Sequence, residues 1–195
     1  MLFSRLALPM DFSAISQEIK HLLDGAWIDH VNNRAYSGKW DVLPLRSLQQ
    51  YQHSHPILQA FSIQVGELWK DLDILQTCPV LQNWLSSFLC PLKSVRLMRL
   101  ASGSHIKPHC DNGLDWTSGE ARLHVPIITS DQVSFLVKGQ PVPMKEGELW
   151  YINAGELHEV KNDSCHDRIH LVIDCEVNDW LSEHFSDDST LLSAR

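Results

Sequence analysis

The sequence is short of basic residues. Only 16 of its 195 residues are Lys or Arg, against 24 Asp and Glu, which gives a formal net charge of −8. A surface that binds nucleic acid or anionic lipid needs clustered Lys and Arg. The basic residues here are scattered along the chain. We therefore expect no nucleic-acid partner and no membrane partner.

Cysteines and long apolar runs are also scarce. The five cysteines form no C-x-x-C pair, which disfavours a disulfide framework and a zinc ribbon. No apolar stretch is long enough to span a bilayer, and the one at the N-terminus is too short for a signal peptide. We therefore expect a reduced, cytoplasmic setting. The sequence has no G-x-S-x-G and no recognisable cysteine nucleophile motif, which disfavours a serine or cysteine hydrolase.

The overall composition is that of an ordinary globular domain. With 44% hydrophobic and 21% charged residues, a chain of this length can bury a sizeable core. It shows no internal repeat and no linker that would divide it. We predict a single domain over residues 1–195, with a helix-rich part (1–92), a β core (93–177), and a short C-terminal helix followed by a tail (178–195).

Three stretches of the N-terminal part repeat apolar residues at helical spacing. They cover residues 12–23, 57–72 and 79–89. Asp11 is a possible N-terminal cap of the first stretch, and Pro79 suits the first helical position of the third. We expect all three helices to pack their apolar faces against the core.

From Lys93 onward the periodicity changes to two. In residues 122–128 and 168–177, apolar side chains occupy one strand face. Polar side chains occupy the opposite face. Strands of this kind, separated by Gly, Pro, Asn and Asp, predict an antiparallel β-sandwich or barrel. If helices cover the apolar face of one sheet, the polar faces can line the mouth of the barrel.

A candidate metal site lies near the start of this β region, before residues 122–128, at His109-Cys110-Asp111. In an extended strand residues i and i+2 share a face, so His109 and Asp111 point into one space. Iron(II) in oxygenases is typically held by two histidines and one carboxylate, with positions left open for substrate and oxygen. His158, at a later strand, is our candidate for the third ligand. Cys110 faces away by the same alternation, and we expect it to pack.

Several motifs now stand in a fixed order along the chain: H-x-D (109–111), R-L-H-V-P-I (122–127), G-E-L-W (147–150), H-E-V (158–160) and R-I-H-L-V-I-D (168–174). Over roughly residues 35–177 the sequence resembles the aspartyl/asparaginyl β-hydroxylase family of iron(II)- and 2-oxoglutarate-dependent dioxygenases. That family also includes bacterial proline hydroxylases. An ordered set of motifs is more specific than any one of them.

The resemblance implies both a fold and an activity. The fold is mainly β with flanking helices: a double-stranded β-helix, or cupin-like jelly roll, with the N-terminal helices packed on one sheet. The cofactors would be iron(II), 2-oxoglutarate as co-substrate, and O2. The reaction would be hydroxylation of an amino acid as a small-molecule substrate, or of an aspartyl or asparaginyl side chain of a peptide, with release of succinate and CO2.

Arginine and histidine residues on the polar strand faces are candidates for binding the carboxylates. A guanidinium grips a carboxylate with two hydrogen bonds and stays charged at any working pH, so Arg168 is the expected anchor of 2-oxoglutarate. By resemblance, Arg122 and His124 bind carboxylates of the co-substrate or of the prime substrate, and we place His124 with the co-substrate. His170 shares the strand face of Arg168 and is a candidate substrate contact.

Arg46 is a further candidate for substrate binding. It lies in residues 35–47, which predict short strands broken by Gly38 and Pro44. The Leu-Arg-Ser segment around it is similar to an early strand of the family. The alternative is a surface arginine whose stem covers apolar area.

Trp116 lies in a glycine-bounded loop, residues 112–121, between the two metal ligands and the strand of Arg122. A loop in that place is expected beside the metal. Gly113 and Gly119 would let it move, and a large aromatic at its tip could exclude water and contact substrate on closure. The alternative is that Trp116 packs on the rim of the barrel.

A different class of function is compatible with the same fold. A cupin-type module could hold zinc or nickel, or bind a ligand, without oxygen chemistry. Arg168 discriminates between the two, because a binding cupin needs no fixed carboxylate anchor ten residues after its last metal ligand. The sequence therefore favours the dioxygenase.

Overall fold

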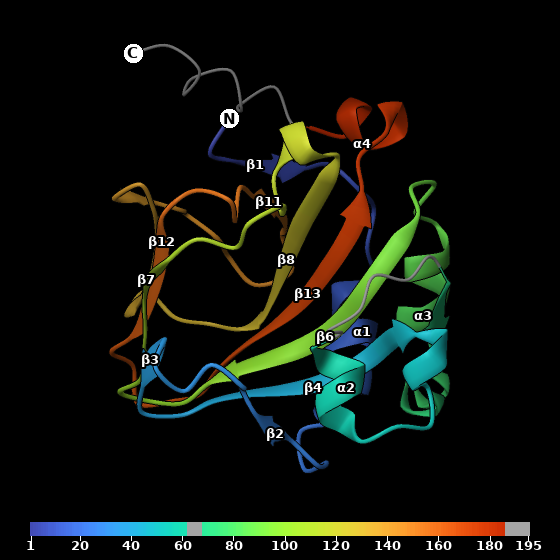
Figure 1. Cartoon of the computed structure of the whole chain (residues 1–195), viewed down its shortest axis with the longest axis horizontal. Coiled ribbons are helices and arrows are strands. Elements are labelled where there is room, and N and C mark those ends of the chain that lie inside the picture. The colour runs from blue at the N-terminus through green and yellow to red at the C-terminus, as the bar shows by residue number, and fades with distance from the viewer. Residues whose placement is uncertain (62–67, 186–195) are drawn as a thin grey trace.

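The computed structural model describes residues 1–61 and 68–185, and in this part of the chain two antiparallel sheets face each other (Figure 1). The larger sheet has the order β1 (Phe3–Leu6), β11 (Leu149–Ile152), β8 (Glu120–Ile128), β13 (Arg168–Glu176), β6 (Leu92–Leu100), β4 (Trp40–Leu48) and β2 (Ile28–Asp29), and β5 (Trp69–Asp71) pairs with β4. The smaller sheet has the order β10 (Gln140–Pro141), β9 (Val133–Val137), β12 (His158–Asn162), β7 (His105–His109) and β3 (Tyr36–Ser37). This is the predicted jelly roll.

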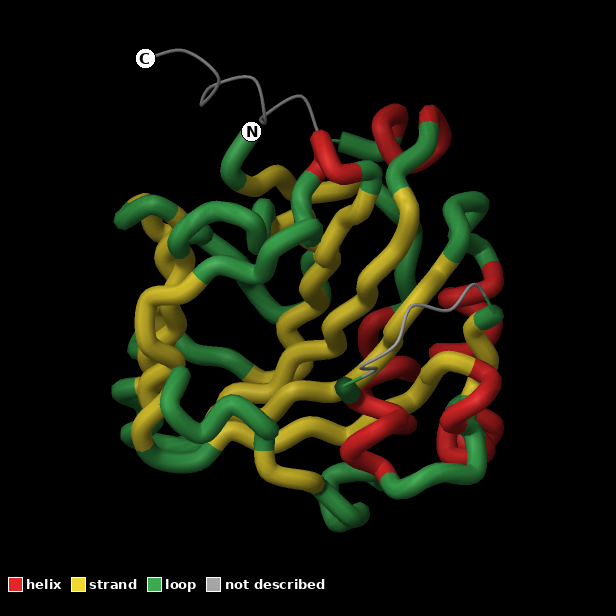
Figure 2. Tube along the Cα trace, in the orientation of Figure 1, coloured by secondary structure: helices red, strands yellow, loops and turns green. Residues whose placement is uncertain are grey.

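The helices lie beside the larger sheet (Figure 2), and their apolar residues join its outer core, except for the second helix, whose Ala60 packs in the core between the two sheets. The helices are α1 (Phe12–Lys20), α2 (Pro56–Ala60), α3 (Pro79–Ser86) and α4 (Asp179–Glu183), with 3-10 turns at Gln49–Tyr51, Asp73–Thr77 and Trp116–Ser118. Within the described residues, no helix is both long and apolar enough to cross a membrane. The predicted arrangement of helices on one sheet is confirmed for α1 and α3, whose apolar residues join the core of that sheet.

The helix boundaries follow local chemistry. Asp11 caps α1, its side chain accepting a hydrogen bond from the backbone N–H of Ala14, and Pro79 occupies the first turn of α3. Asn178 caps α4 in the same way, as expected of the short C-terminal helix. The predicted tail lies outside the described residues.

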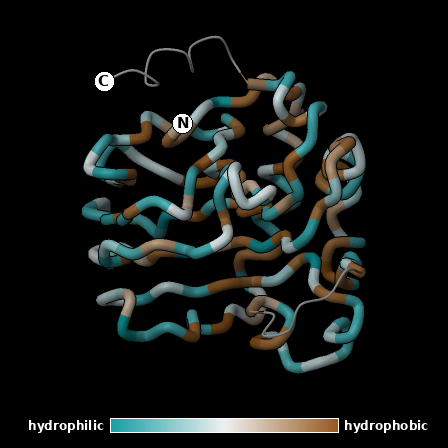
Figure 3. Tube along the Cα trace, turned by 45° about the horizontal axis from the view of Figure 1, so that its top comes forward, coloured by the Kyte–Doolittle hydropathy of each residue, from teal (hydrophilic) through white to brown (hydrophobic). Residues whose placement is uncertain are grey.

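Two hydrophobic clusters lie on opposite faces of the larger sheet. The outer cluster joins α1 and α3 to alternate residues of β6, β8 and β13, such as Leu97, Leu123 and Leu171. The inner cluster fills part of the space between the two sheets and includes Met98 and Val172. Figure 3 shows hydrophobic stretches on the helix side of the molecule and hydrophilic loops at the opposite end. The residues that alternate with the outer cluster along these strands project between the two sheets. The polar side chains among them surround a cavity.

The helix predicted over residues 57–72 is wrong in most of its described part. Only α2 is helical at its start, the centre (62–67) lies outside the described residues, and residues 69–71 form strand β5. Trp69 lies opposite Leu48 of β4, so β5 extends the larger sheet. Pairing at this sheet edge overrides an amphipathic pattern, because short helices are marginal without packing. Leu68, expected in the core, is 66% exposed.

Residues 35–47 form the two-residue β3 and most of the nine-residue β4, and the chain is broken near Gly38 but not at Pro44. Gly38 has a φ of 83°, and a Cβ there would meet the side chain of Ser104. Pro44 lies inside the nine-residue β4, at a register shift against β6, where its missing N–H is tolerated. Strands β1 to β5 all precede residue 93, so the helix-rich N-terminal part also supplies strands to both sheets.

Candidate metal centre and co-substrate cavity

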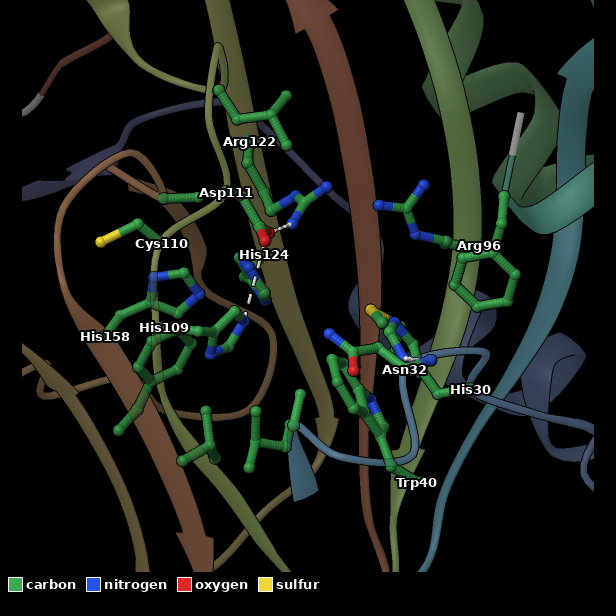
Figure 4. A pocket seen from close by; sticks show the side chains of 18 of the residues that line it. His30, Asn32, Trp40, Arg96, His109, Cys110, Asp111, Arg122, His124 and His158 are labelled. Carbon is green, nitrogen blue, oxygen red and sulfur yellow. Dashed lines mark hydrogen bonds and ion pairs between the residues drawn. The ribbon is translucent and has the colours of Figure 1, made fainter. Parts of the chain in front are cut away.

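A cavity of about 430 Å³ opens between the two sheets. Figure 4 shows the candidate ligands on one side of it and a group of cationic and aromatic side chains on the other. Protein sites for small molecules are typically of this size and mix apolar walls with a few polar groups. Its polar lining residues are His30, Asn32, Arg96, His109, Asp111, Asn112, Arg122, His124, His158 and Arg168.

Strand register brings the three predicted metal ligands together. His109 at the end of β7 and His158 at the start of β12 are direct partners across the ladder, with ring centroids 4.2 Å apart. Asp111 follows β7, and its backbone N–H donates to the carbonyl of Ala154 at 2.8 Å. One ligand atom from each residue lies within 4.8 Å of the others. The structure therefore assembles the two-histidine, one-carboxylate set.

Backbone contacts orient both imidazoles. His109 Nδ1 lies 2.8 Å from the carbonyl oxygen of Lys107, and His158 Nδ1 lies 2.9 Å from that of Glu156. A carbonyl only accepts, so Nδ1 carries the proton in each ring and Nε2 presents a lone pair. Burial lowers the pKa of His158, which keeps the ring neutral. Both histidines are thus prepared to ligate through Nε2, as metal-binding histidines commonly are.

Asp111 belongs to a chain of buried charges. Arg122 donates from Nη1 to Asp111 Oδ2 and makes two further hydrogen bonds to Asp174, from Nε at 2.7 Å and from Nη2 at 3.0 Å. Asp174 also accepts from Arg96 Nη2 at 2.9 Å. One oxygen of Asp111 is therefore held by Arg122, and the other is turned toward His109, 3.8 Å from its Nε2.

These ion pairs fix the protonation states of the carboxylates. Burial raises the pKa of Asp174, but Arg122 and Arg96 outweigh it and hold the pKa well below its ordinary value. The pKa of Asp111 is lowered for a similar reason, burial being outweighed by nearby positive groups, Arg122 foremost. Asp174 and Asp111 in turn outweigh burial at Arg122, and its pKa is raised. All four groups of the chain are charged at neutral pH.

Arg168 is a buried cation without a carboxylate partner in the described part of the chain. It is 2% exposed, donates from Nη2 to His170 Nδ1 at 2.7 Å, and has no hydrogen-bond partner at Nε. Its guanidinium lies 5.8 Å from the ring centre of Phe135. Burial lowers the pKa of Arg168 to about 9, so it remains charged at neutral pH.

Two neutral histidines accompany Arg168. His124 lines the cavity, and its Nδ1 lies 3.4 Å from His170 Nδ1. Burial, with the charge of Arg168, lowers the pKa of both rings well below the usual value. His170 is absent from the cavity lining in the described chain, and its contact is with Arg168. In place of the expected contact with substrate, His170 accepts a hydrogen bond from Arg168 and so helps to hold its guanidinium.

These residues fit the cofactors that the sequence implies. Two imidazoles and one carboxylate with open positions suit iron(II). The unpaired, buried Nε of Arg168 suits one carboxylate of a dicarboxylic acid, since buried charged donors need a partner. The fit at Arg122 is different from expectation. Its guanidinium lines the cavity but is already bonded to Asp111 and Asp174, so it orients a ligand instead of offering itself to substrate.

Arg46 lies outside this cavity, contrary to the prediction. Its guanidinium pairs with Asp71 and donates to the carbonyls of Trp69 at 3.1 Å and Leu92 at 3.3 Å. It lines a separate surface hollow beside α3. Arg46 thus ties β5 to β4 and β6, and its predicted substrate contact is corrected to a structural one.

The lid predicted at Trp116 is not observed. Its ring packs against Tyr151 and Phe185, with centroids 5.6 Å and 5.0 Å away, and its backbone N–H donates to the Tyr151 hydroxyl. Trp116 belongs to the rim of the outer core and does not line the cavity. Leu114, in the same loop, does line it.

The prediction that Cys110 packs in the interior is also wrong: its side chain is exposed at the cavity edge.

Some residues of the cavity were missed by sequence reasoning. Arg96 and its partner Asp174 carried a signal, because each alternates with outer-core residues along its strand, as Arg122 does. His30 lies in a loop, without a motif around it. Its ring stacks on Trp40 at a centroid distance of 3.6 Å and meets Phe61 edge-on at 4.6 Å. No local sequence pattern identifies a loop residue whose position depends on tertiary contacts.

Known structures share this fold at low sequence identity. An oxidoreductase of the 2OG-Fe(II) oxygenase family from Burkholderia pseudomallei is 13% identical, with a TM-score of 0.56 over 82% of this chain and 77% of that one. The α-ketoglutarate-dependent epimerase SnoN from nogalamycin biosynthesis is 11% identical, with a TM-score of 0.51 over 89% and 77%. HygX from Streptomyces hygroscopicus, solved with nickel and 2-oxoglutarate bound, is 12% identical, with a TM-score of 0.50 over 87% and 80%. At these identities the likeness concerns the fold.

Sequence comparison gives the family. The model of the aspartyl/asparaginyl β-hydroxylase family matches residues 10–177, which is most of the chain and contains all the cavity residues described above. The chain therefore belongs to the aspartyl/asparaginyl β-hydroxylase family and is an iron(II)- and 2-oxoglutarate-dependent oxygenase.

Proposed function

We propose that the protein hydroxylates an amino acid, or an aspartyl or asparaginyl side chain, with His109, Asp111 and His158 as the iron ligands. Arg168 and His124 bind 2-oxoglutarate in the same cavity. The proposal rests above all on one observation: the ligand triad and a buried guanidinium with an unpaired Nε line one cavity. Metal binding alone would explain the triad, but it would leave Arg168 without a purpose.

Each residue has a definite task in this scheme. Iron(II), when bound, supplies the oxygen activation and C–H oxidation that protein side chains cannot perform. His109 and His158 ligate through Nε2, and Arg122 keeps Asp111 ionised and turned toward them. The arginine and carboxylate side chains that hold Asp111 are largely buried between the sheets, where a dielectric lower than that of water strengthens their ion pairs.

Arg168 sets the position of the co-substrate. A carboxylate that reaches its unpaired Nε gains a charge-assisted hydrogen bond in a buried place, and Phe135 and His170 restrict the guanidinium to one orientation. A rigid anchor holds the bound acid in one pose. His124 lines the cavity beside it and is neutral, so it can contact a second polar group of the same molecule.

We also propose a cytoplasmic location. The five cysteines are free in the structure, two of them exposed, which suits a reducing compartment. The test is to express the protein in a defined compartment of a host cell and to measure whether its five thiols remain free.

The function is tested by a screen of free amino acids and capped aspartyl and asparaginyl peptides for succinate release and for hydroxylated product. The wild type and His105→Ala should turn over with iron(II) and 2-oxoglutarate, because His105 lies on β7 but outside the cavity lining. His158→Ala should not. Succinate release that persists in His158→Ala would contradict the assignment of the site.

A further inference from the structure

We propose that Arg96 binds a carboxylate of the prime substrate, so that the enzyme acts on a molecule with a free carboxylate and not on the corresponding amide. This inference rests on the proposed function and adds the substrate class to it. Arg96 lines the same cavity as the triad but lies on β6, a strand that contributes none of the proposed iron or 2-oxoglutarate contacts.

Arg96 is buried and incompletely satisfied. It is 8% exposed, donates from Nη1 to Ser94 Oγ and from Nη2 to Asp174, and has no partner at Nε. Figure 4 shows its side chain reaching from β6 toward Arg122, on the side of the cavity opposite His109 and His158. Asp174 and Ser94 hold the guanidinium in place, so a buried donor is fixed at the cavity.

The register of the large sheet separates Arg96 from the 2-oxoglutarate anchor. Arg96 lies opposite Val172 of β13, four residues along the strand from Arg168. Four residues of extended strand span roughly 13 Å, so the two arginines stand at separate points along the cavity. Arg168 serves one carboxylate, and Arg96 is left for another molecule.

The formal charges of the cavity favour a substrate with a free carboxylate. In the described chain, three arginines (Arg96, Arg122, Arg168) face two carboxylates (Asp111 and Asp174), which leaves one positive charge. Bound iron(II) adds two positive charges, and 2-oxoglutarate removes two. One positive charge therefore remains when both are bound. A substrate carboxylate beside Arg96 compensates that charge locally, whereas a cationic substrate without a carboxylate would add to an uncompensated buried charge.

Aromatic side chains that line the cavity together with Arg96 suit the apolar part of such an acid. His30 and Trp40 form a stacked pair, and the pKa of His30 is lowered to about 4, by burial first and by Arg96 next, so the ring is uncharged. Trp40 lines the cavity, and its Nε1 is buried without a partner, which gives one more donor for a polar group of the substrate. The wall thus offers a carboxylate site next to a flat aromatic surface.

The test measures binding without turnover. Protein loaded with iron(II) and 2-oxoglutarate is kept anaerobic, and dissociation constants are measured for the free α-amino acids, for their primary amides, and for the capped peptides acetyl-Gly-Asp-Gly-amide and acetyl-Gly-Asn-Gly-amide. The variants are Arg96→Gln and Arg99→Gln. Arg99 is the matched control, because it lies on the same strand and pairs with Asp41, but it does not line the cavity.

We expect at least one acid to bind about ten-fold or more tightly than its own amide, and Arg96→Gln to remove that preference while Arg99→Gln keeps it. Binding confined to free acids identifies a free acid as the source of the carboxylate, and binding confined to the aspartyl peptide identifies a protein side chain. Both support Arg96 as the site. The acid-to-amide comparison needs only the wild type, so it tests the substrate class even where Arg96→Gln fails to fold.

Two results would overturn the inference while the proposed function stands. One is intact binding of iron(II) and 2-oxoglutarate with no acid preferred over its amide. The other is an acid that binds Arg96→Gln as tightly as the wild type. Failure of the wild type to bind iron(II) and 2-oxoglutarate would instead overturn the proposed function, and the inference with it.

Discussion

Arg122 and Asp174 lie directly opposite each other on β8 and β13, and their side chains form a two-point ion pair with N–O distances of 2.7 Å and 3.0 Å. The remaining nitrogen of Arg122 binds Asp111. A contact between two strands of the larger sheet thereby holds a carboxylate that lies beyond the end of a strand of the smaller sheet. The position of the candidate iron ligand depends on the register of β8 against β13.

Asp174→Asn should be strongly destabilising. It leaves the buried guanidiniums of Arg96 and Arg122 short of their shared carboxylate, and breaking a buried ion pair typically costs about 3 to 5 kcal/mol. The free energy of unfolding from denaturant titration measures this. Glu176→Gln is the control on the same strand. Glu176 is exposed, and its ion pair with Lys93 is long at 3.8 Å, so the substitution should change stability by less than about 1 kcal/mol. Equal effects of the two substitutions would refute the importance of the buried pair.

Arg168→Ala should weaken 2-oxoglutarate binding far more than iron binding. A carboxylate that loses a buried charged partner loses about 2 to 5 kcal/mol, whereas the iron ligands keep their own hydrogen bonds. Calorimetric titrations without oxygen, of iron(II) into the metal-free protein and of 2-oxoglutarate into the iron-loaded protein, give the two affinities. Arg46→Ala is the control, since Arg46 lies outside the cavity. An unchanged 2-oxoglutarate affinity in Arg168→Ala would remove the anchor role.

His30 should make the protein less stable as the pH falls below neutral. Burial, and then the charge of Arg96, lowers its pKa to about 4, whereas a histidine in the unfolded chain titrates near 6.5. Between these values the unfolded state binds a proton that the folded state does not, so the free energy of unfolding falls as the pH is lowered. The contribution is on the order of 1 to 3 kcal/mol. Denaturant titrations from pH 7 to pH 4 should show a shallower decline for His30→Gln, and parallel curves would contradict this.

Trp116→Ala should cost stability without uncoupling the reaction. The ring packs against Tyr151 and Phe185 at the edge of the outer core, so its loss is expected to cost about 2 to 4 kcal/mol. It does not line the cavity, and the ratio of hydroxylated product to succinate should equal that of the wild type. A lower ratio in the variant would restore the lid role that the sequence suggested.

The fold could be predicted where the hydrophobic pattern is strong. Alternation in β8 and β13, with Leu123 and Leu171 on the helix side and Arg122 and Arg168 toward the cavity, defines which faces meet. Strand β5 could not be predicted, because Trp69 becomes part of a strand only through its pairing with Leu48 of β4. That pairing is non-local, and the sequence around Trp69 carries a helical pattern.

The candidate site divides in the same way. His109, Asp111 and Arg168 were found because short motifs mark them, and the structure brings them to one cavity. The role of Arg122 was not visible in its motif, since it depends on Asp174 fifty-two residues later in the chain. His30 had no motif at all and reaches the cavity through its stacking on Trp40.

The most direct test of the account is anaerobic iron(II) titration of the wild type and of His109→Ala, Asp111→Ala, His158→Ala and His105→Ala. The three ligand variants should fold, as judged by circular dichroism, but bind iron far more weakly, because each leaves an incomplete ligand set. His105→Ala removes a histidine of β7 that pairs with Glu159 and should bind iron as the wild type does. Affinities like the wild type in all three ligand variants would contradict the proposed metal centre.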